Sequence, residues 1–312
     1  MPNMTTKSNI SNGQWLSPVV SNQSFCYAPW AKQMVNLTGF DRLIDTTVSR
    51  LRPFQFPGKG RLTELVIPKT GMRNALVFGS RFSLDLSDYL QRHIYAGSFE
   101  RVESAVVRRK LRSGMTFVDV GANVGYYTAL AARLVGPTGA VFAFEPSDYA
   151  FPRLSAMIET NGLTWARAIK YGLAEVPGER LLFGAVDEHF CDLRTATMIP
   201  DGNPHRALVR TETLDYAADQ LNIKHIDFLK IDVDGFEPFV LQGAAGLIEN
   251  HRISNIMMEC AEECFHKINT SIAEVVEGLR LKGLSRISRI ERSGSIAYCT
   301  YVFSLSRTIF GS

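Results

Sequence analysis

Short apolar runs alternate with stretches of helical periodicity between residues 115 and 260, and this alternation constrains the fold more than any other feature. The apolar runs are Met115–Val120, Ala140–Phe144, Phe228–Ile231 and Asn255–Met258. The helical stretches are Tyr126–Leu134, Tyr149–Asn161 and Pro238–Asn250. Strands that alternate with helices pair in parallel through right-handed crossovers, which predicts an open α/β sheet. Ligands of such sheets bind beyond the carboxyl ends of the strands, so the residues after each run form the candidate site.

The first apolar run ends in a turn with two glycines, Asp119-Val-Gly-Ala-Asn-Val-Gly125, and a predicted helix begins at Tyr126. Gly121 and Gly125 carry no Cβ atom, so we expect a ligand to lie directly against this backbone. The turn differs from the Gly-x-Gly-x-x-Gly fingerprint of dinucleotide sites, because Asn123 stands in place of the middle glycine. A cofactor with a charged amino-acid end and no pyrophosphate suits the loop better. The glycines alone are equally compatible with a structural turn.

The second apolar run ends in Phe144-Glu145-Pro146, which places a carboxylate 26 residues after Asp119. In a βαβ unit, an acid at the end of the second strand can accept both hydroxyls of a ribose. Pro146 then turns the chain away from the strand. The spacing and the glycine turn together favour a ribose contact by Glu145 over an exposed strand-end acid.

Ordered motifs with consistent spacing extend from about residue 85 to residue 290. They comprise Phe117–Thr128, Val141–Pro146, Thr213–Asp215, Ile226–Glu237 and Leu241-x-Gly243, with Tyr95–Glu100 upstream. This combination resembles the FkbM family of methyltransferases, and the upstream motif resembles that family's Gly-x-Tyr-Glu lead-in. The set of motifs is much more specific than any one of them.

The resemblance implies a class I, Rossmann-like α/β fold: a mostly parallel seven-stranded sheet with one antiparallel strand and helices on both faces. It implies S-adenosyl-L-methionine as the cofactor, with the ribose at Glu145 and the adenine near Asp187. The methionine part would be surrounded by Asp119, Gly121, Asn123 and Gly125. The complete set of predicted cofactor-binding residues is Glu100, Asp119, Gly121, Ala122, Asn123, Gly125, Tyr126, Glu145 and Pro146.

The third apolar run leads into Lys230-Ile-Asp-Val-Asp-Gly-Phe-Glu237, where four ionisable residues occupy eight positions. If the strand extends to residue 234, alternation places Lys230, Asp232 and Asp234 on one side of it. A carboxylate within hydrogen-bond reach can take the proton of a hydroxyl nucleophile, which contributes about 10²- to 10⁴-fold to the rate. We predict these three residues as catalytic, with Asp232 or Asp234 as the base. Glu237 has an ordinary explanation, because an acid near a helix start is stabilised by the helix dipole.

Alternatives stay open at this acceptor end of the site. The family has Val-Glu-Gly where this chain has Val233-Asp234-Gly235, and the shorter carboxylate leaves a direct role of Asp234 undecided. Glu259 follows the fourth run and either lines the acceptor pocket or satisfies a neighbouring group. Hard cations prefer several oxygen ligands, so Asp232, Asp234 and Glu259 could hold a divalent metal. We predict no metal site, and a divalent metal is the less favoured alternative.

The chain divides into two predicted parts near residue 100. Residues 1–100 are expected to form an N-terminal arm and accessory region, and residues 101–312 the cofactor-binding domain. Residues 1–35 are polar and aperiodic, which is typical of an arm. Gly39–Leu51 has a helical stripe, and Leu62–Ile67 and Ala75–Phe78 indicate strands of a small antiparallel layer. Residues 185–206 are expected to cover the acceptor.

The charge balance and the cysteines bear on partners and compartment. The formal net charge is +3, which is too mild to indicate a nucleic-acid partner. No run of eighteen apolar residues and no basic-then-apolar leader occurs, so we expect neither membrane nor export. Five scattered cysteines are not a disulfide framework. We therefore expect a cytoplasmic protein, and a homo-oligomer is compatible with the sequence.

The resemblance to the FkbM family, together with the carboxylates after the third apolar run, predicts an O-methyltransferase that methylates a hydroxyl of a small molecule or sugar. The range of acceptors in that family implies a secondary metabolite or a glycan. An N-methyltransferase is one alternative, but such enzymes typically carry an Asn-Pro-Pro-Tyr loop where this chain has Asp232-Val-Asp-Gly235. A non-catalytic cofactor-binding module of the same fold is another, since fold does not fix function. A nicotinamide-dependent oxidoreductase lacks its glycine fingerprint here.

Overall fold

The computed structural model describes residues 39–54, 56, 58–184, 197–200, 206–291 and 298–306. The predicted arm of residues 1–35, the candidate adenine neighbour Asp187, and most of the predicted acceptor cover (residues 185–196 and 201–205) lie outside the described residues. None of the described helices has the length and apolar content that a membrane crossing needs.

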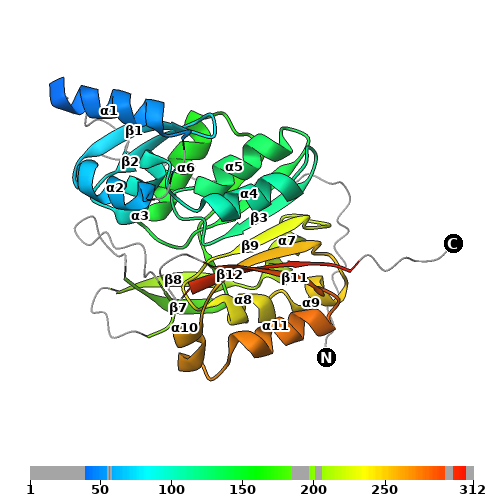
Figure 1. The fold of residues 1–312 in the computed structure, drawn as a ribbon. Helices are drawn as coiled ribbons and strands as arrows, with labels where there is room; N and C mark the ends of the chain where they lie inside the picture. The colour runs from blue at the N-terminus through cyan, green and yellow to red at the C-terminus, as the bar shows by residue number, and fades with distance from the viewer. Residues whose placement is uncertain are drawn as a thin grey trace, which may run out of the picture. The chain divides into compact units, whose positions relative to one another are not determined.

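A seven-stranded sheet in the order β11-β12-β10-β9-β3-β4-β5 lies at the centre of the described chain (Figure 1). Its strands, in chain order, are β3 (Thr116–Val120), β4 (Ala140–Phe144), β5 (Ala166–Ile169), β9 (Phe228–Ile231), β10 (Asn255–Ala261), β11 (Arg286–Glu291) and β12 (Tyr298–Ser304). Neighbouring strands pair in parallel, except that β12 is antiparallel to both β10 and β11. The predicted α/β class with a mostly parallel sheet is confirmed.

Helices cover both faces of this sheet, because its central strands are apolar on both sides (Figure 1). One face carries α4 (Arg101–Lys110), α5 (Tyr126–Val135) and α6 (Ala150–Thr160). The other carries α7 (Leu214–Gln220), α8 (Glu237–Gln242), α9 (Ala245–Glu249) and α11 (Ile272–Leu281), with α10 (Glu262–Lys267) after β10. Successive residues of β3 show the alternation, since Phe117 packs in the first hydrophobic cluster and Val118 in the second.

The N-terminal elements are α1 (Gly39–Leu51), α2 (Lys59–Val66), β1 (Met72–Val77), β2 (Ser80–Asp85) and α3 (Tyr89–Ala96). The predicted helix over Gly39–Leu51 is confirmed, and Ala75–Phe78 overlaps an antiparallel hairpin of β1 and β2. Leu84 of β2 and Tyr95 of α3 belong to the same hydrophobic cluster as residues of α5. The described N-terminal elements therefore share a core with the sheet, and the boundary near residue 100 stays a prediction.

The predicted strand over Leu62–Ile67 is wrong, because this segment forms most of α2. The residues that α2 buries are Lys59 and Thr63, four positions apart, whereas Leu65 is 83% exposed. The Lys59 ammonium donates to the carbonyls of Arg52 and Phe54 at 2.9 Å each. The helical spacing was hidden because the buried face of this helix is polar, and a short apolar run does not distinguish helix from strand.

The predicted single helix over Pro238–Asn250 is two helices, α8 and α9, separated at Gly243. A Cβ atom on Gly243 would lie 2.0 Å from the carbonyl oxygen of Ala174, so the chain approaches a neighbouring loop there. Asp215 accepts the N–H groups of Gly246 at 2.8 Å and Leu247 at 2.9 Å, which satisfies donors at the start of α9. The Thr213–Asp215 motif therefore has a structural role.

A second sheet, in the order β6-β8-β7, lies after β5 in the chain and was not predicted. Its strands are β6 (Gly172–Leu173), β7 (Gly178–Phe183) and β8 (Arg206–Glu212). β6 pairs in parallel with β8, and β7 pairs antiparallel with it. This sheet contributes Gly172, Leu173 and Leu182 to the pocket described below.

Candidate active site

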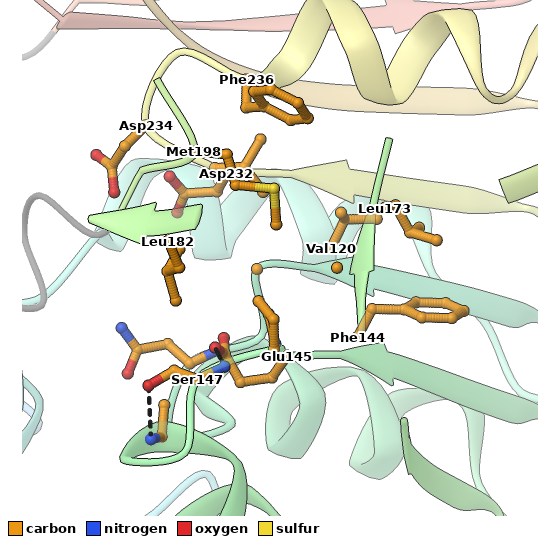
Figure 2. Close-up of a pocket in the computed structure, with 16 residues that line it drawn as sticks. Val120, Phe144, Glu145, Ser147, Leu173, Leu182, Met198, Asp232, Asp234 and Phe236 are labelled. Atoms are coloured by element: carbon orange, nitrogen blue, oxygen red, sulfur yellow. Dashed lines mark hydrogen bonds between the residues drawn. The ribbon is translucent and has the colours of Figure 1, made fainter. Parts of the chain in front are cut away.

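One pocket lies at the carboxyl ends of β3, β4 and β9, where the strand pattern predicts ligand binding. Figure 2 shows Asp232 and Asp234 on one side of it and Glu145 and Ser147 on the opposite side. Its apolar lining includes Val120, Phe144, Leu173, Leu182, Met198 and Phe236. Of the predicted cofactor residues, Gly121, Asn123, Glu145 and Pro146 line the pocket, whereas Glu100, Asp119, Ala122, Gly125 and Tyr126 do not.

The two glycines of the first turn are required by contacts within the chain. Gly121 has a φ of 74°, and a Cβ atom on it would lie 2.0 Å from the carbonyl oxygen of Asp232. Gly125 has a φ of 93°, and its Cβ atom would lie 2.5 Å from the Met157 methyl group and 2.9 Å from a Leu154 methyl group. The structural explanation of these glycines therefore holds, and the predicted approach of a ligand to Gly121 and Gly125 stays a prediction.

Glu145 connects the ends of β3 and β4. Its carboxylate accepts the N–H of Asn123 at 2.8 Å and the N–H of Ser147 at 2.9 Å. Asn123 has a φ of 51°, and its side-chain oxygen accepts the N–H of Val124 at 2.7 Å. Burial raises the pKa of Glu145 to about 7, against the opposing effect of the two backbone donors. Each carboxylate oxygen keeps a further lone pair with which it can accept a hydrogen bond from a ligand hydroxyl.

Asp119 is fully buried beneath the pocket rather than in its wall. The hydroxyl of Thr128 on α5 donates to one carboxylate oxygen at 2.7 Å. The other oxygen lies 3.9 Å from the Lys230 ammonium and has no hydrogen-bond partner among the described residues. Burial raises the pKa of Asp119, while Lys230 and Thr128 oppose that shift. Asp119 thus connects β3 to α5 through a hydrogen bond and to β9 through an ion pair.

Lys230 lies in the interior and forms an ion pair with Asp232, with Nζ 2.9 Å from the carboxylate. Burial acts to lower the pKa of Lys230, but the charges of Asp232, Asp119 and Glu100 outweigh it and raise the pKa above its ordinary value. The ammonium also lies 4.8 Å from the ring centroid of Tyr127. These neighbouring charges favour the protonated ammonium form of Lys230.

The strand alternation predicted for Asp234 does not hold, because β9 ends at Ile231. Asp234 lies in the following turn with a φ of 49°, and its carbonyl accepts the Thr197 hydroxyl at 2.9 Å. Asp232 and Asp234 both line the pocket, so the turn still brings both carboxylates to it (Figure 2).

Glu237 holds this turn in shape. Its carboxylate accepts the N–H of Val233 at 3.0 Å and the N–H of Gly235 at 3.2 Å. It is buried at the start of α8, and burial raises its pKa to about 7. Glu237 therefore has the structural role that the sequence indicates. Its hydrogen bonds to the turn add to the stabilisation that the helix dipole gives.

Three carboxylates from distant parts of the chain converge beside the pocket: Glu100 before α4, Asp232 after β9 and Glu259 on β10. One oxygen of each lies within 4.8 Å of the others, so together they could hold a cation. The Tyr127 hydroxyl donates to Glu100 at 2.7 Å. The alternative metal set of Asp232, Asp234 and Glu259 is thus corrected, since Glu100 takes the place of Asp234. A resemblance to a cofactor motif was the only sequence signal at Glu100.

Several pocket residues escaped sequence reasoning, because their positions depend on pairing between β6, β7 and β8. Met198 and Leu182 both line the pocket, and Met198 is drawn next to Asp232 (Figure 2). Its methyl group would lie 2.4 Å from a Cβ atom on Gly172. The cavity has a volume of about 70 Å³. Pockets for small organic ligands measure roughly 300–1,000 Å³, so this cavity is smaller than a typical site for a nucleoside ligand. Met198 is a flexible side chain in its lining, and its movement would enlarge the cavity.

Comparison with known proteins shows a match to a family model. Residues 119–283 match the family model described as the methyltransferase FkbM domain. A protein named Methyltransferase 1 from Beauveria bassiana (strain ARSEF 2860) is 26% identical over 168 residues, which cover 46% of this chain and 64% of that protein. The matching region thus spans less than two thirds of its relative's length.

Solved structures of low sequence identity also resemble the chain. An FkbM methyltransferase from Methylobacillus flagellatus KT is 13% identical, with a TM-score of 0.43, and the match covers 83% of this chain and 60% of that one. An rRNA methylase from Streptococcus thermophilus is 13% identical, with a TM-score of 0.41, and the match covers 65% of this chain and 94% of that one.

Proposed function

The chain belongs to the FkbM family of methyltransferases, and from this premise we propose that it is an S-adenosylmethionine-dependent O-methyltransferase acting on a hydroxyl of a small molecule or sugar. The observation that carries the proposal is the Asp232 carboxylate, which lines the pocket and is paired with a buried ammonium. Three features bear on it: the cofactor side of the pocket, the base, and the choice between oxygen and nitrogen.

The cofactor side of the pocket suits an adenosyl group with an amino-acid tail. Glu145 is the residue that would accept the ribose hydroxyls, and it already has two backbone donors that hold its carboxylate in place. The apolar side chains of Phe144 and Leu173 would lie against the adenine ring of the cofactor. When bound, the cofactor supplies an electrophilic methyl group on a sulfonium.

Asp232 is the proposed base. A hydroxyl is a weak nucleophile until its proton leaves, and a carboxylate within hydrogen-bond reach can accept that proton. The Lys230 ammonium at 2.9 Å stabilises the ionised carboxylate and orients it, so Lys230 acts as a positioning residue. Asp234 lines the same pocket, and its turn position supports a role in binding the acceptor rather than in proton transfer.

The residues after β9 favour oxygen over nitrogen as the acceptor atom. N-methyltransferases of the amino groups of bases or glutamine typically use a loop whose carbonyls accept amino hydrogens. Here the same position holds the carboxylates of Asp232 and Asp234. A carboxylate base is needed for a hydroxyl, which must lose its proton as it reacts. The exclusion of a nucleic-acid acceptor stays a prediction.

The test combines binding with turnover. Calorimetry should show micromolar binding of S-adenosylhomocysteine to wild type and to Asp232→Asn, and its loss in Glu145→Ala. Methyl transfer from labelled cofactor to a panel of methyl glycosides and phenols should fall about 10²- to 10⁴-fold in Asp232→Asn. Asp148→Asn, which alters an exposed acid outside the pocket, is the matched control.

Each outcome has a defined meaning. Equal loss of cofactor binding and turnover in Asp232→Asn would defeat its assignment as the base. Mass spectrometry that finds the methyl group on nitrogen would replace the O-methyltransferase proposal with the N-methyltransferase alternative. Binding without transfer to any acceptor would favour the non-catalytic module.

A further inference from the structure

A second pocket lies beside α4, away from the carboxyl ends of β3, β4 and β9. We call it the arginine pocket; it is lined by Arg52, Pro53, Leu76, Val77, Phe78, Ile94, Gly97, Phe99, Arg101, Ser104, Ala105, Arg108 and Tyr126. These residues come from the ends of α1, β1 and α3, from α4, and from the first residue of α5. It shares no lining residue with the candidate active site. Its volume is about 440 Å³, within the roughly 300–1,000 Å³ of small-molecule sites.

All the charged side chains that line this pocket are arginines. Three guanidinium groups line it, and none of its lining residues, all of which the structure describes, is Asp or Glu. Within the described residues, neither Arg101 nor Arg108 takes part in a salt bridge. Arg52 donates to the backbone carbonyls of Tyr95 and Leu76 at 2.8 Å each. Arg52 also interacts with the charge of Asp45, so the excess positive charge of the pocket lies on Arg101 and Arg108.

The neighbouring Lys59 responds to the same field. Its ammonium is surrounded by backbone carbonyls, including those of Arg52 and Phe54 at 2.9 Å and Gly97 at 3.2 Å. Burial, followed by the charges of Arg101 and Arg52, lowers the pKa of Lys59 to about 8. A fixed anion beside Arg101 and Arg52 would relieve this repulsion.

The remaining lining is apolar and aromatic. The Arg108 guanidinium lies 4.8 Å from the ring centroid of Phe78, and Phe78 and Phe99 each lie 4.9 Å from the ring centroid of Tyr126. Leu76 is 60% exposed although it lines the pocket. Apolar surface beside guanidinium groups suits a ligand that has both an anionic group and an apolar body.

We propose that the arginine pocket binds a small organic anion, in which a carboxylate, sulfonate or phosphate group lies against Arg101 and Arg108 and an aromatic or short acyl body lies against Phe78 and Leu76. The proposal is independent of the proposed function. The arginine pocket and the active site are nevertheless adjacent in the chain, since Arg101 lines the first and Glu100 belongs to the carboxylates beside the second.

The test uses the anionic aromatic dye anilinonaphthalene sulfonate and the full chain, with dye fluorescence as the readout. We expect saturable one-to-one binding that saturating S-adenosylhomocysteine does not displace. The double variant Arg101→Gln/Arg108→Gln should weaken binding about tenfold, because each of the two exposed ion pairs to the anion accounts for a part of that change in Kd. Arg109→Gln/Arg112→Gln removes the same charge from exposed residues outside the pocket and is the matched control.

A steric variant separates shape from charge. Ala105 is exposed and lines the pocket, so Ala105→Trp should fill it without removing charge or disturbing the core. Loss of dye binding in this variant, together with the arginine effect, supports the proposal. Absence of saturable binding, displacement of the dye by S-adenosylhomocysteine, or equal weakening by the Arg109/Arg112 control would overturn it.

Discussion

Replacing Lys230 by methionine tests the electrostatic arrangement beneath the active site. The ammonium lies 3.9 Å from an Asp119 carboxylate oxygen that has no hydrogen bond among the described residues, and it is paired with Asp232 at 2.9 Å. Removing one partner of a buried ion pair leaves the other charge in a medium of low polarity. Such changes typically lower the free energy of unfolding by about 3–5 kcal/mol.

The magnitude can be read as a urea midpoint. With a denaturant slope of about 3 kcal/mol per molar urea, a loss of 3–5 kcal/mol lowers the midpoint by about 1–2 M. Circular dichroism at pH 7 provides the measurement. The double variant Lys230→Met/Asp119→Asn should recover part of the loss, because the amide that replaces the Asp119 carboxylate carries no charge that needs compensation.

The pH dependence of stability tests the same arrangement in the Lys230→Met variant. Burial raises the pKa of Asp119 in the folded state, so protonation of this carboxyl group favours folding. As pH rises the group ionises, and the buried charge lowers the free energy of unfolding. Without Lys230 this loss is larger, and the difference between wild type and Lys230→Met should narrow as pH falls below neutrality. A loss under about 1 kcal/mol, or a double variant no more stable than the single one, would mean that Lys230 does not compensate the Asp119 charge.

Three further predictions follow from the site. Because burial raises the pKa of Glu145 to about 7, S-adenosylhomocysteine affinity should fall as pH drops below 7, and calorimetry of Glu145→Gln should show no such dependence. Gly125→Ala places a Cβ atom against Met157 and Leu154 at a positive φ, so the free energy of unfolding should fall by about 2–5 kcal/mol; an unchanged urea midpoint would contradict this. Met198→Ala frees space in the pocket, so the S-adenosylhomocysteine Kd should fall about 2- to 10-fold, whereas a higher Kd would mean that Met198 contacts the ligand.

The amino-acid sequence by itself determines the class of the fold and the chemistry at the strand ends. The apolar runs of β3, β4, β9 and β10 are local signals, because a strand that is buried on both faces consists mostly of apolar residues. Glu145 and Asp232 could be identified for a related reason: a charged residue directly after a buried strand lies at the edge of the sheet, where ligands bind. These inferences need only neighbours along the chain.

The tertiary structure decided the features that depend on contacts between distant segments. The helix α2 escaped prediction because its buried face is Lys59 and Thr63, and only the carbonyls around Lys59 make that burial favourable. Gly121 is a glycine because the carbonyl of Asp232 approaches it, which no local pattern reveals.

The same holds for both candidate binding sites. Glu100 meets Asp232 and Glu259 only through the packing of the folded chain, because it lies more than a hundred positions before either of them in the sequence. The arginine pocket likewise gathers side chains from five elements. Sequence patterns report which side a residue faces within its own element; which other segments meet it there is decided by packing of the whole chain.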